Sequence, residues 1–228
     1  MIKKVLLFAS LFASTAVLNA QQKGDWASFD HYENNNKADK NLPASQRKVV
    51  FMGNSITEFW YKQDSAFFKE NGFIGRGISG QVTSQMLVRF RQDVLALQPQ
   101  AVVILAGTND IAQNDGPISL ENIFGNIVSM AEIAKAHGIK VVISSVLPAS
   151  EYPWRPGLQP NIKIPQLNQM LSDYCKKNKV VYADYFTKMA NAQKGLDKEL
   201  SGDGVHPTLA GYKMMEGIIL PVIKKVAR

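Results

Sequence analysis

The chain has 228 residues, of which 46% are hydrophobic and 20% are charged, and its formal net charge is +7. This length fits one domain with a sizeable core, and we find no internal repeat or low-complexity tract. The lysines are scattered or lie at expected helix ends without an aromatic-basic stripe, so we expect no nucleic-acid partner. The single cysteine, Cys175, cannot form an intrachain disulfide, so we expect a packing residue. One cysteine and three separated histidines also argue against a zinc site, and we expect no metal and no cofactor.

The first twenty residues have the pattern of a secretory signal peptide. Lys3 and Lys4 precede an apolar stretch over residues 5–17, and Ala20 provides a small residue before the expected cleavage site. The apolar stretch is shorter than the roughly 18–20 residues that a membrane span needs. We therefore expect a secreted or periplasmic protein, without stable membrane insertion once residues 1–20 are removed. A buried N-terminal helix is the alternative.

Residues 21–46 are polar, but three aromatic side chains recur in them at regular spacing. Trp26, Phe29 and Tyr32 follow one another every three residues, which would place them along one side of a short helix. We predict an N-terminal helix packed on the body of the protein, followed by a linker at residues 41–43. A loose tail is the alternative.

Over residues 47–228, short apolar runs alternate with longer amphipathic stretches, as in one α/β domain. We predict strands over residues 49–52, 73–78, 101–105, 140–146 and 180–183. We predict helices over residues 58–70, 83–97, 120–137, 162–177 and 209–226. This alternation predicts a five-stranded parallel sheet that is covered by helices on both faces and joined by right-handed crossovers.

Polar residues follow three of the predicted strands at their carboxyl ends. Ser55 follows the first strand, Gly80 the second and Asn109 the third. Ligands of open parallel sheets bind at this edge, so we expect the three residues to face one site. Each also has a purely structural alternative. Ser55 could begin a capping box with Glu58, and the other two could belong to ordinary turns or caps.

A serine hydroxyl is a poor nucleophile until a base takes its proton, and three histidines are available for that role. His137 lies at the expected end of a helix, where a following glycine suits the cap. His31 belongs to the polar N-terminal segment. His206 remains, three residues after Asp203, so Ser55, His206 and Asp203 are the candidates for a hydrolytic triad. The serine segment lacks the second glycine of G-x-S-x-G, which argues against an α/β-hydrolase elbow.

Four blocks occur in order, FMGNSIT at residues 51–57, GISGQVT at 77–83, GTND at 107–110 and DGVHP at 203–207. With them the chain resembles the SGNH hydrolases, the GDSL-type esterase and lipase superfamily, over about residues 47–225. The resemblance implies a flavodoxin-like three-layer α/β/α fold. It also implies a nucleophile, a base and an orienting acid, here Ser55, His206 and Asp203. The implied oxyanion hole consists of the Ser55 N–H, Gly80 and Asn109.

The sequence departs from the pattern of this superfamily at two positions. Asn54 stands where the superfamily more often has aspartate, and Gln81 stands where an acid is frequent. These departures leave local hydrogen bonding and pH dependence open, but they do not change the expected reaction class.

The loop after the fourth strand could supply a wall for the substrate. It contains Trp154, whose flat ring suits a sugar face, and Arg155, although packing of a proline-rich loop is the alternative. Trp60 could form a second wall or belong to the core. We expect a secreted esterase for short-chain acyl esters, mainly acetyl groups on carbohydrates, with a small-molecule or glycan ester as its partner. The alternatives are a lysophospholipase- or thioesterase-type acyl hydrolase and, more distantly, a non-catalytic anion-binding domain.

Overall fold

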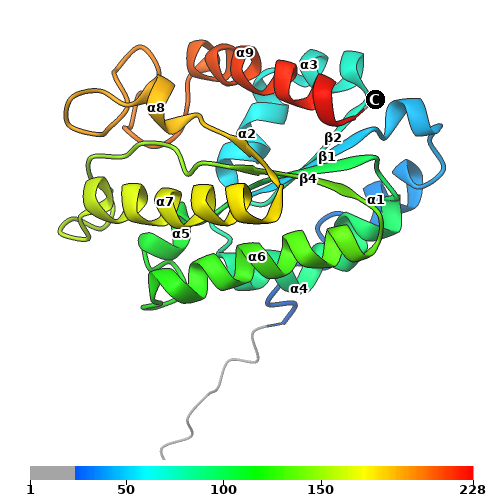
Figure 1. The fold of residues 1–228 in the computed structure, drawn as a ribbon, viewed down its shortest axis with the longest axis horizontal. Helices are drawn as coiled ribbons and strands as arrows, with labels where there is room; N and C mark the ends of the chain where they lie inside the picture. Colours follow the sequence, from blue (N-terminus) through cyan, green and yellow to red (C-terminus); the bar gives the residue numbers. More distant parts are fainter. Residues whose placement is uncertain (1–23, 228) are drawn as a thin grey trace, which may run out of the picture.

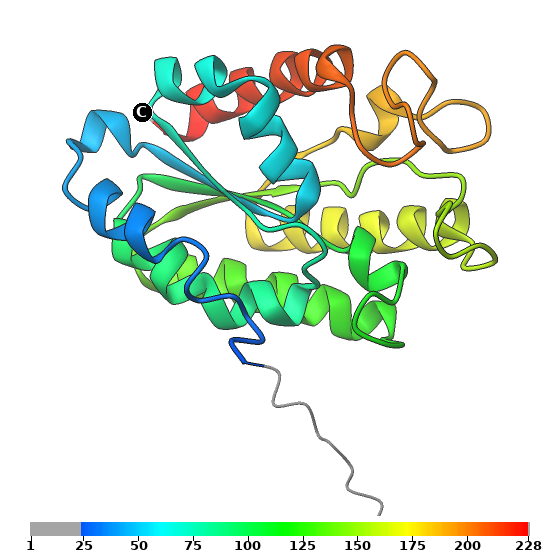
Figure 2. The same cartoon turned by 180° about the vertical axis from the view of Figure 1, so that it is seen from behind.

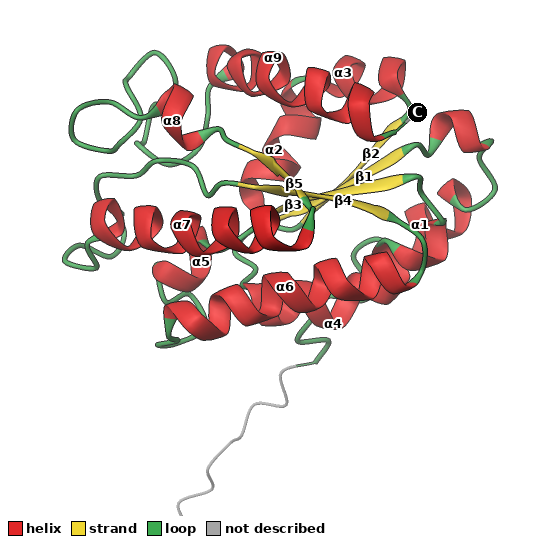
Figure 3. Cartoon of the chain, in the orientation of Figure 1, coloured by secondary structure: helices red, strands yellow, loops and turns green. Residues whose placement is uncertain are grey.

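Five short strands form one parallel sheet in the order β2-β1-β3-β4-β5. The computed structural model describes residues 24–227, so the expected signal segment lies outside the described residues. The strands are β1 (Val49–Gly53), β2 (Phe73–Gly77), β3 (Ala101–Leu105), β4 (Lys140–Ser144) and β5 (Val181–Ala183). All five predicted strands are present, and the predicted three-layer α/β/α class is confirmed (Figure 1, Figure 3).

Helices cover both faces of this sheet. The helices of the described chain are α1 (Glu33–Asp39), α2 (Ser55–Gln63), α3 (Ser65–Asn71), α4 (Thr83–Asp93), α5 (Thr108–Ile111), α6 (Leu120–Ala136), α7 (Pro160–Asn178), α8 (Phe186–Met189) and α9 (Leu209–Val226). Figure 1 shows α2, α3 and α9 on one face and α4, α6 and α7 on the other. The sheet therefore lies between two helical layers, each with its own apolar core.

The two cores follow from the alternation of side chains along β1 and β3. Val50 and Met52 of β1 belong to the core under α4, α6 and α7, whereas Val49 and Phe51 belong to the core under α2, α3 and α9. Every residue of both strands is buried. A continuous apolar run is the pattern of a strand that is covered on both faces, which is why the sequence located these strands well. Cys175 packs in the first of these cores, as expected, and burial raises the pKa of its thiol to about 12.

Two predicted helices are each divided in the structure. The predicted helix over residues 58–70 separates into α2 and α3 at Asp64, whose carboxylate accepts a hydrogen bond from the Phe67 N–H at 3.2 Å. The predicted helix over residues 83–97 becomes α4 and a 3₁₀ turn over Leu95–Leu97. The four-residue helices α5 and α8 were not predicted, because an element of one turn carries no periodicity that a sequence could reveal.

The N-terminal helix begins later than the aromatic spacing predicts. Residues 24–32 form successive turns, and helix α1 starts at Glu33. The Ser28 N–H donates to the Asp25 carbonyl, the His31 N–H donates to Ser28, and Ser28 has a φ of +56°. Turns that close every three residues thus account for the three-residue spacing of the aromatic side chains, which precede the N-terminal helix and do not lie along it.

The described part of this N-terminal segment (residues 24–46) packs on the body mainly through polar contacts, since α1 buries none of its residues. The Tyr32 hydroxyl donates to the Gly77 carbonyl at the end of β2, and the Arg76 guanidinium lies over the Tyr32 ring. The Asn36 amide donates to Asp93 Oδ1 at 2.6 Å. In Figure 2 the segment, in blue, runs along the molecule beside α4. It is therefore fixed by hydrogen bonds to β2 and α4, next to the carboxyl end of the sheet.

Candidate active site

Ser55 is the first residue of α2, directly after the carboxyl end of β1. The helix is capped by Asn54, whose side-chain oxygen accepts a hydrogen bond from the Ile56 N–H at 3.1 Å. Asparagine is a preferred cap because its oxygen satisfies an otherwise unpaired N–H at the helix start. The capping role that the sequence left open for Ser55 is therefore filled by its neighbour, and the Ser55 hydroxyl remains available for another partner.

Glu58 does not complete a capping box with Ser55. One oxygen of its carboxylate accepts from the Ser79 N–H at 2.8 Å and from the Ser79 hydroxyl at 2.6 Å, and the other pairs with Lys62. The start of α2 comes so close to β2 that a Cβ on Gly77 would lie 2.2 Å from the Glu58 nitrogen. A glycine at this position and the Glu58 carboxylate together fix the loop after β2 against α2.

His206 lies in a turn that Asp203 organises. One oxygen of the Asp203 carboxylate accepts from the backbone N–H groups of Val205 and His206, at 2.9 and 2.7 Å. The Ser201 hydroxyl donates to the His206 carbonyl at 2.8 Å. The other carboxylate oxygen accepts from His206 Nδ1 at 2.7 Å. Because an ionised carboxylate can only accept, Nδ1 donates to it, and the neutral form of the ring then has its lone pair on Nε2.

The structure brings Ser55 and His206 together, although they are 151 positions apart in the chain. Ser55 Oγ lies 2.9 Å from His206 Nε2, which is hydrogen-bonding distance. Ser55, His206 and Asp203 thus form a continuous chain of two hydrogen bonds. Only 6% of Ser55 is exposed, so neighbouring residues cover most of its surface.

The packing of α2 against α9 holds these two groups in place. The Trp60 ring stacks on Tyr212 with centroids 5.6 Å apart, and the Tyr212 hydroxyl donates to the Ile56 carbonyl at 2.8 Å. The Trp60 indole N–H donates to Glu216 Oε1 at 3.1 Å. Trp60 is only 1% exposed. It is therefore a core residue and cannot form a substrate wall, because its ring is used to join the two helices.

The surroundings of Asp203 keep it ionised. Partial burial alone would raise its pKa, but the hydrogen bonds from the His206 ring and from the two backbone N–H groups outweigh burial and lower the pKa to about 2. A carboxylate at neutral pH maintains the orientation and tautomer of the His206 ring.

Gly80 and Asn109 lie on neighbouring loops that are bonded to each other. Gly80 has a φ of +80°, a conformation that glycine adopts without strain. Asn109, in the short helix after β3, donates from Nδ2 to the Gln81 carbonyl at 2.9 Å. The buried Asp110 carboxylate accepts from the N–H and hydroxyl of Thr83, which joins the same two loops. An amide nitrogen carries two hydrogens, so Asn109 can serve Gln81 and a ligand together.

Two aromatic rings flank His206. The Trp154 ring is nearly parallel to the imidazole, with centroids 6.4 Å apart, and the Phe59 ring lies 5.2 Å away. Trp154 is 47% exposed, so one part of its ring remains open to solvent. Sequence reasoning missed Phe59. The signal was available, because residues four apart share one face of a helix and Phe59 is four residues after Ser55.

The loop that carries Trp154 is anchored on the turn after β3. Arg155 donates from Nη1 to the carbonyls of Ala112 and Gln113. The buried Tyr152 hydroxyl shares a hydrogen bond with the Thr108 hydroxyl at 2.9 Å. The contacts of Arg155 are thus made to the backbone of the protein, and they hold the Trp154 loop beside the candidate site.

The other two histidines lie away from Ser55. His137 caps the C-terminal end of α6, where its Nδ1 lies 2.8 Å from the Ile133 carbonyl. His31 is exposed in the N-terminal segment, with its ring against Tyr32. Within residues 24–227, no cluster of three or more histidine, cysteine or acidic side chains is placed to hold a metal ion.

Comparison with known proteins assigns this chain to a family. The sequence matches the GDSL-like lipase/acylhydrolase family over residues 51–214. The chain belongs to this family. It is accordingly a carboxylic ester hydrolase of the GDSL type, and the resemblance that the four sequence blocks predicted is confirmed. The matched range contains Ser55, Asp203 and His206 together with both loops that carry Gly80 and Asn109.

Two solved structures are similar along most of the GDSL-type chain. A proposed acylhydrolase from Bacteroides fragilis is 46% identical with a TM-score of 0.87, covering 90% of this chain and 100% of that one. A GDSL-like lipase from Bacteroides thetaiotaomicron is 48% identical with a TM-score of 0.84, covering 87% and 98%. The uncharacterized lipoprotein YqeF of Bacillus subtilis is 33% identical over 81 residues, which are 34% of this chain. That match spans 33% of the relative's length.

The depressed pKa of Asp203 predicts a specific pH dependence of stability. The value of about 2 in the folded protein lies below the ordinary 3.8, so the carboxylate contributes stability above pH 4 that is lost as the pH falls toward 2. We expect the excess of the unfolding free energy of the wild type over that of Asp203→Asn to shrink as the pH falls from about 4 toward 2. Urea unfolding at each pH measures it.

Asp173→Asn, which removes an exposed carboxylate of α7, is the control for the loss of one negative charge. A wild-type excess that stays constant or grows as the pH falls from about 4 to 2 would contradict the depressed pKa of Asp203.

Proposed function

We propose that this protein hydrolyses short-chain acyl esters, acetyl esters above all, with Ser55 as nucleophile, His206 as base and Asp203 as the residue that orients the base. The observation that carries the proposal is the pair of hydrogen bonds of 2.9 and 2.7 Å that join the three side chains in this order. Such a chain of nucleophile, base and orienting acid meets the geometric requirement for acyl transfer. The family, whose members are acylhydrolases, agrees with this chemistry.

In the proposed mechanism, His206 Nε2 accepts the hydroxyl proton while Ser55 Oγ attacks the ester carbonyl carbon. The carbonyl electrons move to the oxygen, and this oxyanion accepts hydrogen bonds from the Ser55 N–H, the Gly80 N–H and the Asn109 amide. As the C–O bond to the alcohol breaks, His206 returns the proton to the leaving oxygen. A water molecule then gives a proton to His206, attacks the acyl carbon and releases the acid, and the proton returns to Ser55.

The surroundings of Ser55 favour a small acyl group on a larger, flat alcohol. The low exposure of Ser55 suits an acetyl group better than a long chain. The half-exposed ring of Trp154 beside His206 offers an apolar face, which suits the face of a sugar ring. We therefore propose an acetylated carbohydrate as the substrate class, with Trp154 as the stacking platform.

We also propose that the protein acts outside the cytoplasm, in the periplasm or the medium, because residues 1–20 have the basic and apolar pattern of a signal peptide. Expression of the full-length gene in a bacterium should give a mature protein that begins near Gln21, which mass spectrometry of the extracytoplasmic fraction measures. Recovery of an uncleaved cytoplasmic chain would contradict export.

The assignment of the nucleophile predicts one covalent adduct. A serine-directed phosphonate should label the wild type at Ser55, and Ser55→Ala should abolish labelling, as intact-mass and peptide spectra will report. His206→Ala should lower kcat by roughly 10⁴–10⁶-fold, because His206 is the one base within residues 24–227 that is bonded to the hydroxyl. The matched control is His137→Ala, which removes a histidine from the end of α6 and should leave kcat unchanged. Near-native turnover by His206→Ala would remove it from the mechanism.

The substrate proposal predicts a split between small and glycan esters. On esters of graded acyl length, kcat/KM should be greatest for acetyl and fall by about tenfold or more toward eight carbons, since only 6% of Ser55 is exposed. Trp154→Ala should raise KM for acetylated oligosaccharides. It should change KM for a small acetyl ester only slightly. Activity that rises with chain length would instead favour a lysophospholipase-type enzyme, and equal effects on both esters would remove Trp154 as the platform.

A further inference from the structure

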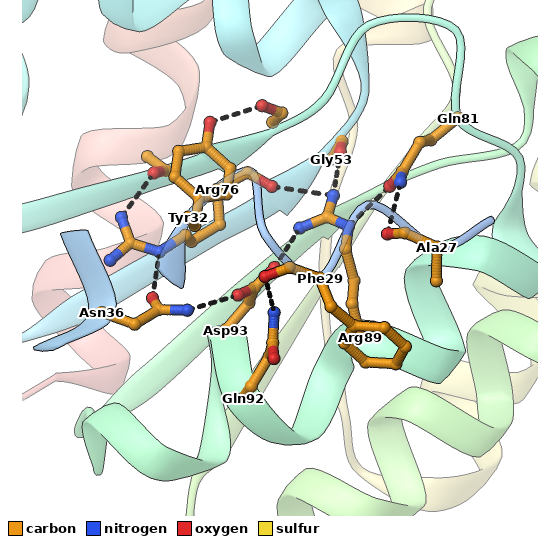
Figure 4. Close-up of polar contacts among 12 residues, drawn as sticks. Ala27, Phe29, Tyr32, Asn36, Gly53, Arg76, Gln81, Arg89, Gln92 and Asp93 are labelled. Carbon is orange, nitrogen blue, oxygen red and sulfur yellow. Dashed lines mark hydrogen bonds and ion pairs between the residues drawn. The ribbon is translucent and has the colours of Figure 1, made fainter. Parts of the chain in front are cut away.

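Gln81 is buried and is bonded to several parts of the molecule, among them Arg89 and Ala27 (Figure 4). Its backbone carbonyl accepts a hydrogen bond from Asn109 Nδ2 at 2.9 Å. Its side-chain oxygen accepts from Arg89 Nε at 2.5 Å, and its side-chain nitrogen donates to the Ala27 carbonyl at 2.9 Å. Gly80 precedes it directly in the chain. Gln81 is thus bonded to one candidate oxyanion donor and covalently joined to another.

Arg89 fixes the side chain of Gln81 from the interior. Its guanidinium is fully buried and donates to the carbonyls of Gly53 at 2.9 Å and Arg76 at 3.1 Å, at the ends of β1 and β2. It also pairs with the Asp93 carboxylate at 2.7 Å. Gly53 lies two residues before the proposed nucleophile. One guanidinium therefore fixes Gln81 relative to the strand end from which the nucleophile emerges.

The N-terminal segment fixes the same side chain from the outer side. The carbonyl that accepts from the Gln81 amide belongs to Ala27, in the turns that precede α1. The Asn36 amide of α1 donates to Asp93, the carboxylate that pairs with Arg89 (Figure 4). The oxygen and the nitrogen of the Gln81 amide are thus bonded to two different parts of the structure, Arg89 of α4 and the N-terminal segment.

We propose that Gln81 is a positioning residue that holds the Gly80 N–H and the Asn109 amide in the orientation that the oxyanion requires. This inference rests on the proposed function, because the orientation matters only if Ser55 forms an acyl-enzyme. Gln81 makes no contact with the reacting atoms and acts through its bond to Asn109 and its peptide bond to Gly80. Two of the three proposed donors are therefore joined to the backbone of residue 81, whose side chain is held by Arg89 and by the Ala27 carbonyl.

A positioning role of this kind has a distinct kinetic signature. Donors aimed at the oxyanion stabilise the transition state more than the bound substrate, so that their displacement lowers kcat and leaves KM nearly unchanged. Moving a donor by a fraction of an ångström lowers the reaction rate less than removing the donor does, but a shift of about 1 Å can lower the rate about 100-fold. A residue that served folding alone would lower the unfolding temperature without this effect on the folded enzyme.

Three variants separate these roles. Gln81→Met removes both side-chain hydrogen bonds at nearly constant size. Gln81→Glu keeps the oxygen that accepts from Arg89. It replaces the nitrogen that donates to the Ala27 carbonyl with a carboxylate oxygen, which cannot donate. The control is Gln92→Ala, because the Gln92 amide donates to the Phe29 carbonyl at 2.7 Å and so also ties the N-terminal segment to α4 (Figure 4). It contacts none of the proposed donors. Gln85 is unsuitable as a control, because it also accepts from the Val82 N–H, next to Gln81.

For each variant, kcat, KM and the unfolding temperature are measured with an acetyl ester, well below the lowest unfolding temperature. Gln81→Met should lower kcat by about 10–100-fold with KM nearly unchanged. Gln81→Glu should recover most of kcat even if its unfolding temperature is as low as that of Gln81→Met. Gln92→Ala should lose stability but keep the wild-type kcat.

The inference is overturned if Gln81→Met keeps the wild-type kcat, or if kcat follows the unfolding temperature across all three variants. Failure of the proposed function is a separate result, in which the wild type itself hydrolyses no ester and takes no phosphonate label at Ser55. A wild type that is active and labelled, with an unaffected Gln81→Met, therefore rejects the positioning role alone.

Discussion

The packing of α2 on α9 is the constraint on which the candidate site depends. Ser55 begins α2 and His206 shortly precedes α9, so the distance between them is set by how the two helices meet. Stacking of Trp60 on Tyr212 and a hydrogen bond from Tyr212 to the first turn of α2 define that contact. Aromatic stacking fixes separation, and the hydrogen bond fixes rotation and register. Two groups from distant parts of the chain can therefore remain within hydrogen-bonding distance.

The second feature near the nucleophile is a buried ion pair between Arg89 and Asp93. Desolvation lowers the pKa of Arg89, and the carboxylate of Asp93 opposes that effect. Burial of such a pair gives little net stability, because the cost of removing both charges from water offsets their attraction. The pair instead fixes the directions in which the Arg89 N–H groups donate. The fork of donors on Arg89 joins the ends of β1 and β2 to Gln81, which an apolar side chain of equal volume could not do.

Much of this arrangement was predictable from the sequence, because buried parallel strands are continuous apolar runs and their carboxyl ends share one edge. It was harder to predict which residue takes which role at that edge. Ser55 and Asn54 are both good caps, and only the folded loop shows that Asn54 takes the role. Phe59 and Trp60 are adjacent in the sequence, yet the helical rotation between them sends one ring to the site and the other to the core. The N-terminal turns repeat every three residues, so their spacing imitates a helix.

Asp203 and His206 lie in a turn whose hydrogen bonds are made mostly among its own residues. Ser55, by contrast, lies near the start of the domain in the sequence. On the proposed mechanism, this division has a consequence for biosynthesis. A nascent chain that has been translated only as far as β5 contains the Ser55 hydroxyl but not His206, the proposed base. Hydrolytic chemistry therefore becomes possible only after α9 has been made and has docked, so an incomplete chain cannot attack esters during its synthesis.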